Sequence, residues 1–244
     1  MSVFVIADLH LSTASETNKS MEVFGNRWTN YQNKIKSNWN KVITAEDTVV
    51  IPGDISWATT LEEAYDDLSF IDSLPGKKII GKGNHDFWWS TVSKMTRFLE
   101  ENKLTTISFL FNNAYVAENL IICGTRGWFY DTDNAKIPEN SDYDRLISRE
   151  TARLKLSLDS ALKLKEKNPG SEIVAFLHFP PLWNDCEVEK ICDTLADYGI
   201  SRCYFGHIHG NYNTPPYFEH KGVEYILISS DYLDFLPRII PPVN

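Results

Sequence analysis

The stretch KIIGKGNHDF, residues 78–87, joins a short apolar run to the motif GNHD. Its first three residues predict a buried strand, and a helix is predicted over residues 87–102. Asn84, His85 and Asp86 therefore lie where the strand ends. In α/β sheets, functional sites are built at the carboxyl ends of strands. The stretch predicts a layered α/β fold with a site at this edge of the sheet.

The same alternation continues in both directions along the chain. Short runs rich in Val, Ile and Phe predict buried strands, and longer amphipathic stretches predict helices. Strand–helix alternation favours two facing mixed β-sheets flanked by helices, in one domain that spans residues 1–244. The predicted strands are 3–7, 48–51, 78–80, 120–123, 173–177, 203–205 and 225–228, and the predicted helices are 27–43, 60–73, 87–102, 142–167 and 188–198.

Two segments depart from simple alternation. Residues 107–128 read as strand, Asn-Asn turn, strand, Glu-Asn turn and strand, which predicts a β-meander. The helix predicted over 142–167 ends at Asn-Pro-Gly, a good terminator. Its residues recur every four positions and are apolar with one exception, Glu150. The repeating residues are Leu146, Glu150, Leu154, Leu158 and Leu162.

Composition narrows the class of protein. The chain has 244 residues, 43% of them hydrophobic and 23% charged, and its net charge is −9. A non-specific nucleic-acid binder usually has a basic surface, so the negative net charge gives no strong indication that the chain binds nucleic acid. The apolar run 3–7 is too short for a secretory signal, and no run approaches a membrane span. We therefore expect a cytoplasmic protein with no membrane partner.

The cysteines indicate a reducing compartment. They form no CxxC pair, and the six-residue separation of two of them is not a usual zinc spacing. We expect reduced, mostly buried thiols. The four are Cys123, Cys186, Cys192 and Cys203.

Residues that bind metals gather after the predicted strands. Five of the six histidines and several acids follow strand ends, whereas His220 does not. A single histidine in such a place is often structural, but the whole set in this arrangement predicts a metal site. The set comprises Asp8 and His10, Asp54, Asn84 with His85 and Asp86, His178, and His207 with His209.

The spacing of these residues suits a pair of ions. Side chains at i and i+2 of an extended segment face the same way, about 6.6 Å apart along the chain. Paired catalytic ions lie roughly 3.5–4 Å apart, and one carboxylate can bridge them. Asp54 is the best placed to do so. Mixed nitrogen and oxygen donors suit Mn, Fe, Zn, Ni or Co better than Ca.

The ordered motifs D-x-H, G-D, G-N-H-D, H and G-H-x-H resemble those of the calcineurin-like metallophosphoesterase superfamily. The resemblance runs from Asp8 to His209 and implies two divalent metal ions, Mn above all. It also implies that His85 is a catalytic residue near the leaving oxygen and not a ligand. The first ion would be bound by Asp8, His10, Asp54 and His209, and the second by Asp54, Asn84, His178 and His207.

The implied activity is hydrolysis of a phosphoester, a diester or monoester of a small molecule or nucleotide, by metal-activated water. Phosphoprotein phosphatases of the superfamily extend the second motif to G-D-x-x-D-R-G. Here the stretch reads GDISWAT, with Trp57 in place of the acid and no arginine after it. The chain is therefore more similar to bacterial phosphohydrolases and cyclic-nucleotide phosphodiesterases than to protein phosphatases.

Some roles stay open at this level. Asp86 could orient His85 or a ligand, as a catalytic residue, or could be the acid that begins the helix 87–102. Arg126 could bind a substrate phosphate or form a surface ion pair. Five tryptophans near strand ends could wall a base-stacking pocket or pack in the core. A non-catalytic scaffold of the same fold and a nuclease remain alternative functions. The tryptophans are Trp57, Trp88, Trp89, Trp128 and Trp183.

Overall fold

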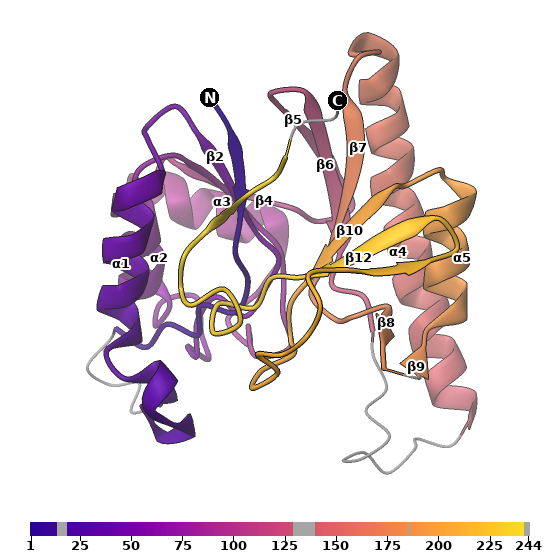
Figure 1. The fold of residues 1–244 in the computed structure, drawn as a ribbon. Helices are drawn as coiled ribbons and strands as arrows, with labels where there is room; N and C mark the ends of the chain where they lie inside the picture. Colours follow the sequence, from indigo (N-terminus) through magenta and orange to yellow (C-terminus); the bar gives the residue numbers. More distant parts are fainter. Residues whose placement is uncertain (14–18, 129–139, 185, 242–244) are drawn as a thin grey trace.

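The computed structural model describes residues 1–13, 19–128, 140–184 and 186–241. Two large sheets face each other at the centre, and helices cover their outer sides. In Figure 1, α1 and α2 flank one sheet, and α4 and α5 flank the other. This arrangement confirms the predicted α/β fold of two facing mixed sheets with flanking helices.

The first sheet has the strand order β13-β1-β2-β3-β4. Strands β1 to β4 run parallel, and β13 is antiparallel to β1. The strands are β1 (Val3–Val5), β2 (Thr48–Ile51), β3 (Lys77–Ile80), β4 (Ile107–Phe109) and β13 (Arg238–Ile239). The helices between them are α1 (Tyr31–Val42), α2 (Tyr65–Ser73) and α3 (Val92–Glu101), preceded by short 3-10 turns η1 (Met21–Phe24) and η2 (Asn26–Trp28).

The second sheet has the order β11-β12-β10-β7-β6-β5. Its four central strands are parallel, and its two edge strands are antiparallel to their neighbours. The strands are β5 (Ala114–Ala117), β6 (Leu120–Thr125), β7 (Glu172–Leu177), β10 (Arg202–Phe205), β11 (Phe218–His220) and β12 (Val223–Leu227). Helices α4 (Asn140–Lys167) and α5 (Glu189–Asp197) and a small hairpin of β8 (Leu182–Trp183) and β9 (Cys186–Glu187) complete this half.

The second sheet is buried on both faces. Along β7, Val174 and Phe176 pack into the core between the two sheets, whereas Ala175 and Leu177 pack into the core beneath the helices. This is the alternation expected of a strand, whose successive side chains point to opposite faces. Phe176 stacks on Tyr204 with ring centroids 5.3 Å apart. Because both faces are covered, the polar strand ends are left as the place for a site.

The predicted β-meander over 107–128 is wrong. Strand β4 pairs in parallel with β3 in the first sheet, and only β5 and β6 form an antiparallel pair in the second. Asn112, with φ 59°, lies in the connection between the sheets. The Asn-Asn turn therefore carries the chain from one sheet to the other, which strand spacing alone did not reveal.

Three helices begin later than predicted. Asn30 has a left-handed backbone, so α1 starts at Tyr31 and not at residue 27. Helix α3 starts only at Val92, where the Thr91 side chain accepts a hydrogen bond from the Lys94 N–H. Helix α2 likewise begins at Tyr65, after turns over residues 60–64. The residues predicted to form the first turns of these three helices therefore lie in loops or short turns before the helices begin.

No disulfide joins the four cysteines, all of which lie among the described residues. Cys123, Cys192 and Cys203 are buried, and Cys186 is partly buried. Over the described parts of the chain, the structure contains no helix with the length and apolar character needed to cross a membrane.

Candidate metal centre

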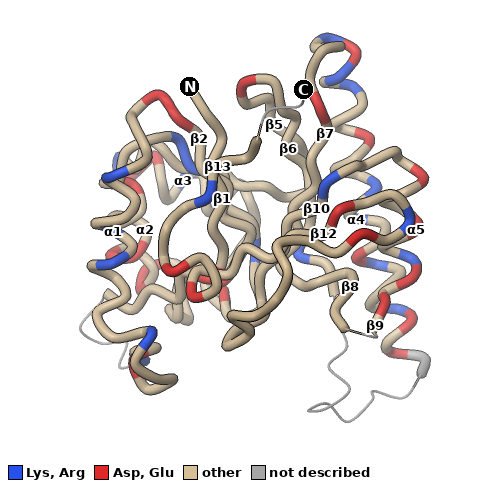
Figure 2. The backbone as a smooth tube through the Cα atoms, viewed as in Figure 1, with Lys and Arg blue, Asp and Glu red and all other residues tan. Residues whose placement is uncertain are grey.

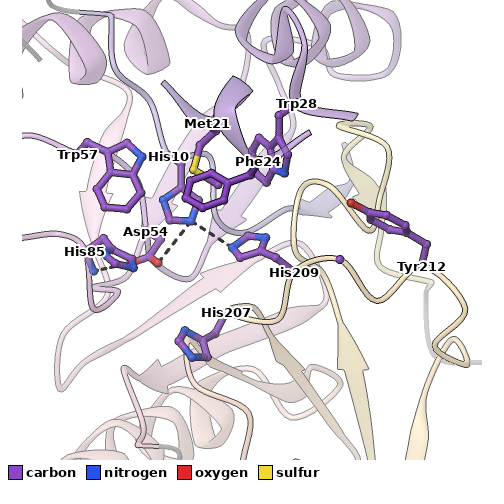
Figure 3. Close-up of a pocket in the computed structure, with 11 residues that line it drawn as sticks. His10, Met21, Phe24, Trp28, Asp54, Trp57, His85, His207, His209 and Tyr212 are labelled. Atoms are coloured by element: carbon purple, nitrogen blue, oxygen red, sulfur yellow. Dashed lines mark hydrogen bonds and ion pairs between the residues drawn. The ribbon is translucent and has the colours of Figure 1, made fainter. Parts of the chain in front are cut away.

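The strand ends of both sheets meet in one cleft. Asp8 and His10 follow β1, Asp54 follows β2, and Asn84 follows β3. His178 directly follows β7, on the second sheet. Figure 3 shows His10 and Asp54 facing His209, with His207 approaching from the opposite side. Residues separated by about 200 positions in the sequence thus share one site.

The first group of donors consists of Asp8, His10 and His209. One ligand atom from each lies within 4.8 Å of the others. The Nε2 atoms of His10 and His209 are 3.2 Å apart. His209 Nδ1 lies 2.8 Å from the buried carboxylate of Asp231, which fixes Nδ1 as the donor and leaves Nε2 with a free lone pair. Burial disfavours the charged ring, but Asp231 and Asp8 together raise the pKa of His209.

The second group consists of Asp54, His178 and His207, again with ligand atoms within 4.8 Å. Asn84 joins it, since its Oδ1 lies 2.7 Å from His178 Nε2. The His207 N–H donates to both oxygens of Asp8, at 3.0 and 2.9 Å. This contact ties the two groups together. All seven residues predicted as ligands are thus close together.

Asp54 lies between the two groups. Its Oδ2 is 3.6 Å from His10 Nε2 and 3.5 Å from His178 Nε2. Its Oδ1 accepts a hydrogen bond of 2.8 Å from the His85 N–H. One oxygen of the carboxylate is therefore used by the backbone, and the other faces both histidines.

The donor set fits divalent transition-metal ions. At metal–ligand distances of about 2.1 Å, neighbouring donors lie roughly 3.0–3.4 Å apart. The separation of 3.2 Å falls within this range, and those of 3.5 and 3.6 Å lie slightly above it. Burial is the main cause that raises the pKa of Asp8 to about 6 and that of Asp54 well above its usual range. A bound cation would offset the crowding of these buried acids.

Two of the histidines, His10 and His178, are held in the neutral state that metals require. Burial is the main factor that lowers the pKa of His10 and of His178 well below the usual range, followed by neighbouring histidines. Neutral imidazole is the form that binds metals. The Nδ1 atoms of both rings are buried without a hydrogen-bond partner in the described structure. Each ring makes its polar contact through Nε2, His10 with His209 and His178 with Asn84.

The backbone at the cleft is strained. Asp8, His10, Asp54 and His207 have positive φ angles of 59°, 46°, 50° and 71°. Such left-handed conformations cost about 1–3 kcal/mol each for residues other than glycine, and they gather at functional sites. Gly83 is also needed here, because a Cβ at this position would overlap the Asp54 carboxylate. The chain is thus bent to bring the ligand side chains together.

Asp86 organises the loops that carry the donors. Its fully buried carboxylate accepts hydrogen bonds from the N–H groups of Asp54 (2.9 Å), Ile55 (2.9 Å) and Gly83 (2.7 Å), and from Trp88 Nε1 (3.0 Å). Because α3 starts at Val92, Asp86 does not lie in its first turn. These contacts indicate a positioning role toward Asp54.

An apolar cavity of about 420 Å³ opens onto the donor groups. His85 lines it, and its ring centroid lies 4.3 Å from that of Trp57. Trp57 in turn stacks on His10 with centroids 5.0 Å apart. Figure 3 shows Met21, Phe24, Trp28 and Tyr212 around the same space. Among the apolar and aromatic residues of this cavity, the sequence pointed to Trp57 alone.

The remaining predicted residues are distributed among different surroundings. Arg126 is largely buried, with its side chain 19% exposed, and lies 3.8 Å from Glu150, so it is not a surface ion pair. Trp88 and Trp183 are buried in the two cores. Trp89 and Trp128 pack against these cores while remaining partly exposed. Asp231 was missed, although it follows β12 much as the other acids follow their strands.

Comparisons with known proteins found one matching family model and several similar solved structures. The family model "calcineurin-like phosphoesterase" matches residues 1–211. The protein TT1561 of Thermus thermophilus is 8% identical, with a TM-score of 0.57 over 94% of this chain and 89% of that chain. AQ665 of Aquifex aeolicus, a protein of unknown function, is 19% identical over 98% of this chain and 95% of that chain, with a TM-score of 0.42. No curated protein sequence matches the chain.

The likeness to TT1561 supports the fold, and the family match covers every one of the seven donors described above. The chain belongs to the calcineurin-like phosphoesterase family.

Proposed function

We propose that this chain hydrolyses a phosphoester by using two divalent transition-metal ions. The observation that carries the proposal is the position of Asp54 Oδ2, 3.6 Å from His10 and 3.5 Å from His178. A single oxygen between two donor groups is suited to bridge two ions. The first ion would be bound by Asp8, His10, Asp54 and His209, and the second by Asp54, Asn84, His178 and His207.

Mn²⁺ is the ion we expect, and Fe, Zn, Ni or Co suit the same nitrogen and oxygen donors. When bound, such ions would activate water and offset negative charge on the phosphoryl oxygens. The protein's own part is to fix the donors. Asp231 orients His209, and Asp86 holds the loop of Asp54.

His85 is the residue we propose to act on the leaving oxygen. Its ring lines the cavity beside the donor groups, and its N–H is anchored on Asp54. Burial is the first cause that lowers the pKa of His85, so the ring is uncharged at neutral pH. A neutral imidazole N–H can donate a hydrogen bond to the departing oxygen and stabilise it. Asp86 supports this geometry by accepting hydrogen bonds from the N–H groups of Asp54, Ile55 and Gly83. It does not need to contact the substrate.

The cavity indicates the class of substrate. Its walls are aromatic and apolar, with Trp28 and Trp57 close to the donors. A small-molecule or nucleotide phosphoester could place its organic part against these rings. Lys and Arg alternate with Asp and Glu along α4 and α5 in Figure 2, which does not favour a nuclease that grips a long polyanion.

Metal removal tests the proposal. We expect the chelator-treated protein to be inactive on bis-p-nitrophenyl phosphate and on p-nitrophenyl phosphate, and Mn²⁺ to restore turnover of at least one. Metal content, measured alongside, should rise from none to about two ions per chain. Full activity after verified removal of both ions would overturn the proposal. Two bound ions without turnover of any phosphoester in a broad panel would instead support a non-catalytic scaffold.

A further inference from the structure

A second cavity, of about 330 Å³, lies outside the one that opens onto the donor groups. Its walls come from the loop after β3, the connection between β4 and β5, the end of β6, and α4. Its polar lining is strongly basic. The charged residues that line it are Lys82, Arg126, Arg149, Arg153 and Glu150.

Glu150 lies close to all three arginines that line this cavity. Its side chain is fully buried, and its Oε1 lies 2.7 Å from Arg153, 3.4 Å from Arg149 and 3.8 Å from Arg126. This is the residue that interrupts the apolar repeat of α4. One carboxylate cannot neutralise three guanidinium groups, and Lys82 forms no ion pair within the described residues. The lining therefore carries a surplus of three positive charges.

Within the described parts of the chain, no acid other than Glu150 lies at ion-pair distance from these four basic side chains. Asp86 is the acid nearest in sequence to Lys82, but its oxygens are occupied by backbone N–H groups and Trp88. Two buried donors on cavity-lining residues, Arg126 Nε and Trp89 Nε1, find no acceptor in the described structure. A cavity with excess cations and unpaired N–H groups is complementary to an anion rich in acceptor oxygens.

We propose that this cavity binds a phosphate group, separate from the one acted on at the donor groups. Guanidinium groups match phosphate oxygens in pairs, and a lysine adds a point charge. A phosphate dianion would offset most of the surplus of three charges, whereas a single carboxylate would offset only one.

The cavity is close to the candidate metal centre. Lys82 precedes Asn84 by two residues, so no more than roughly 7 Å of chain separates them. The Arg126 carbonyl accepts hydrogen bonds from the N–H groups of His178 (3.1 Å) and Phe179 (2.9 Å). A substrate with two phosphate groups could therefore present one at each place. The phosphate could equally be a free inorganic ion, and the two sources are distinguished below.

Direct binding is the first test, and it does not depend on turnover. Inorganic pyrophosphate is titrated into the full chain stripped of divalent ions, at low salt, by calorimetry. We expect binding that Lys82→Met and Arg153→Gln each weaken about tenfold to a hundredfold, since each removes a charge-assisted contact. Arg97→Gln is the matched control, because Arg97 is 69% exposed on α3 and pairs with Glu101. Thermal melting of each variant confirms that it is folded.

Absence of binding by the wild-type chain, or equal binding by both folded cavity variants, would overturn the proposal. Binding lost in the variants and kept in Arg97→Gln would support it. Since the ions are absent from this titration, its outcome is independent of the proposed hydrolysis.

The second test identifies the source of the phosphate, and only here does the inference rest on the proposed function. With Mn²⁺-loaded protein, KM is compared for a nucleoside monophosphate and the matching 3′,5′-bisphosphate. If the cavity holds the second phosphate of a substrate, the wild type favours the bisphosphate and Lys82→Met abolishes that preference. An unchanged ratio of the two KM values, with weakened pyrophosphate binding, assigns the cavity to free phosphate. Failure of both nucleotides to turn over would count against the proposed function and leave the binding result intact.

Discussion

The first sheet supplies every carboxylate and amide donor of the candidate metal centre, whereas the second supplies only histidines. Asp8, His10, Asp54 and Asn84 follow strands of the first, and His178, His207 and His209 follow strands of the second. Neither sheet completes a donor group. Each group in the structure draws on both, so the centre depends on how the sheets pack against each other.

The two sheets therefore contribute differently to the candidate metal centre. The first sheet brings negative charge into a buried place, at a cost that is visible in the raised pKa values of Asp8 and Asp54, for which burial is the main cause. The second sheet supplies only imidazole nitrogens, which add no negative charge to the buried site. Metal binding would compensate the first sheet and link it to the second.

The largest effect is expected from Asp54→Asn. This variant keeps an oxygen to accept the His85 N–H and replaces the oxygen between His10 and His178 with an NH₂ group that cannot bind a metal. We expect both ions to be lost and activity to fall at least about a thousandfold, because bound ions contribute several kcal/mol of transition-state stabilisation. Elemental analysis and turnover measure the two outcomes.

His178→Ala is the comparison from the second sheet. His178 belongs to one donor group only, so this variant should keep roughly one ion per chain. If Asp54→Asn also keeps one ion per chain, Asp54 does not bridge two ions, and the two donor groups do not share its carboxylate.

The next effect is expected from His85→Ala. The variant should retain both ions and lose about 10²–10⁴-fold in turnover, because His85 acts on the leaving oxygen and not on the metals. His220→Ala is the control, since His220 lies in β11 and contacts Glu187 at 2.9 Å, outside the cleft. Loss of ions in His85→Ala would make His85 a ligand and a further contribution of the first sheet.

Much of this fold could be predicted from the sequence, because buried parallel strands are continuous apolar runs. Strand β2 matches its prediction in full, and the motif residues follow their strands as expected. The partner of β4 could not be predicted, since a short strand carries no signal that says which sheet it joins. The starts of α2 and α3 were placed too early because turns beyond the motif have helix-compatible residues.

The site divides in the same way. Short motifs at predicted strand ends identified the seven donor residues, because the carboxyl ends of parallel strands lie at the same edge of a sheet. The role of Asp231 needed the structure, since the hydrogen bond to His209 joins residues 22 apart with no motif between them. The role of Glu150 also needed it. A polar residue in an apolar repeat signals a buried partner, but the sequence does not say that the partners include Arg126, 24 positions earlier.

Asp231→Asn should have a smaller effect on the second sheet's contribution. Asp231 accepts from Gly210 N–H at 3.0 Å and holds His209 Nδ1, so the variant loosens the orientation of one ligand. We expect Mn²⁺ affinity to weaken about 10–100-fold. Asp234→Asn is a close control, because Asp234 is 75% exposed and 3.6 Å from Arg27. Equal affinity of Asp231→Asn and wild type would show that packing alone orients His209.

The smallest effect is the stabilisation of the whole fold by metal. Mn²⁺ at about 100 times its Kd should add about 2.7 kcal/mol per site, and one such increment raises the Tm of a chain of this length by roughly 5–10 °C. Because each donor group spans both sheets, slower amide exchange should appear in β1 and β2 and also in β7 and β10. Hydrogen–deuterium exchange by mass spectrometry measures the two sheets separately. Protection confined to the first sheet would mean that its carboxylates bind the ions without the histidines, and that the two sheets are not joined through the metals.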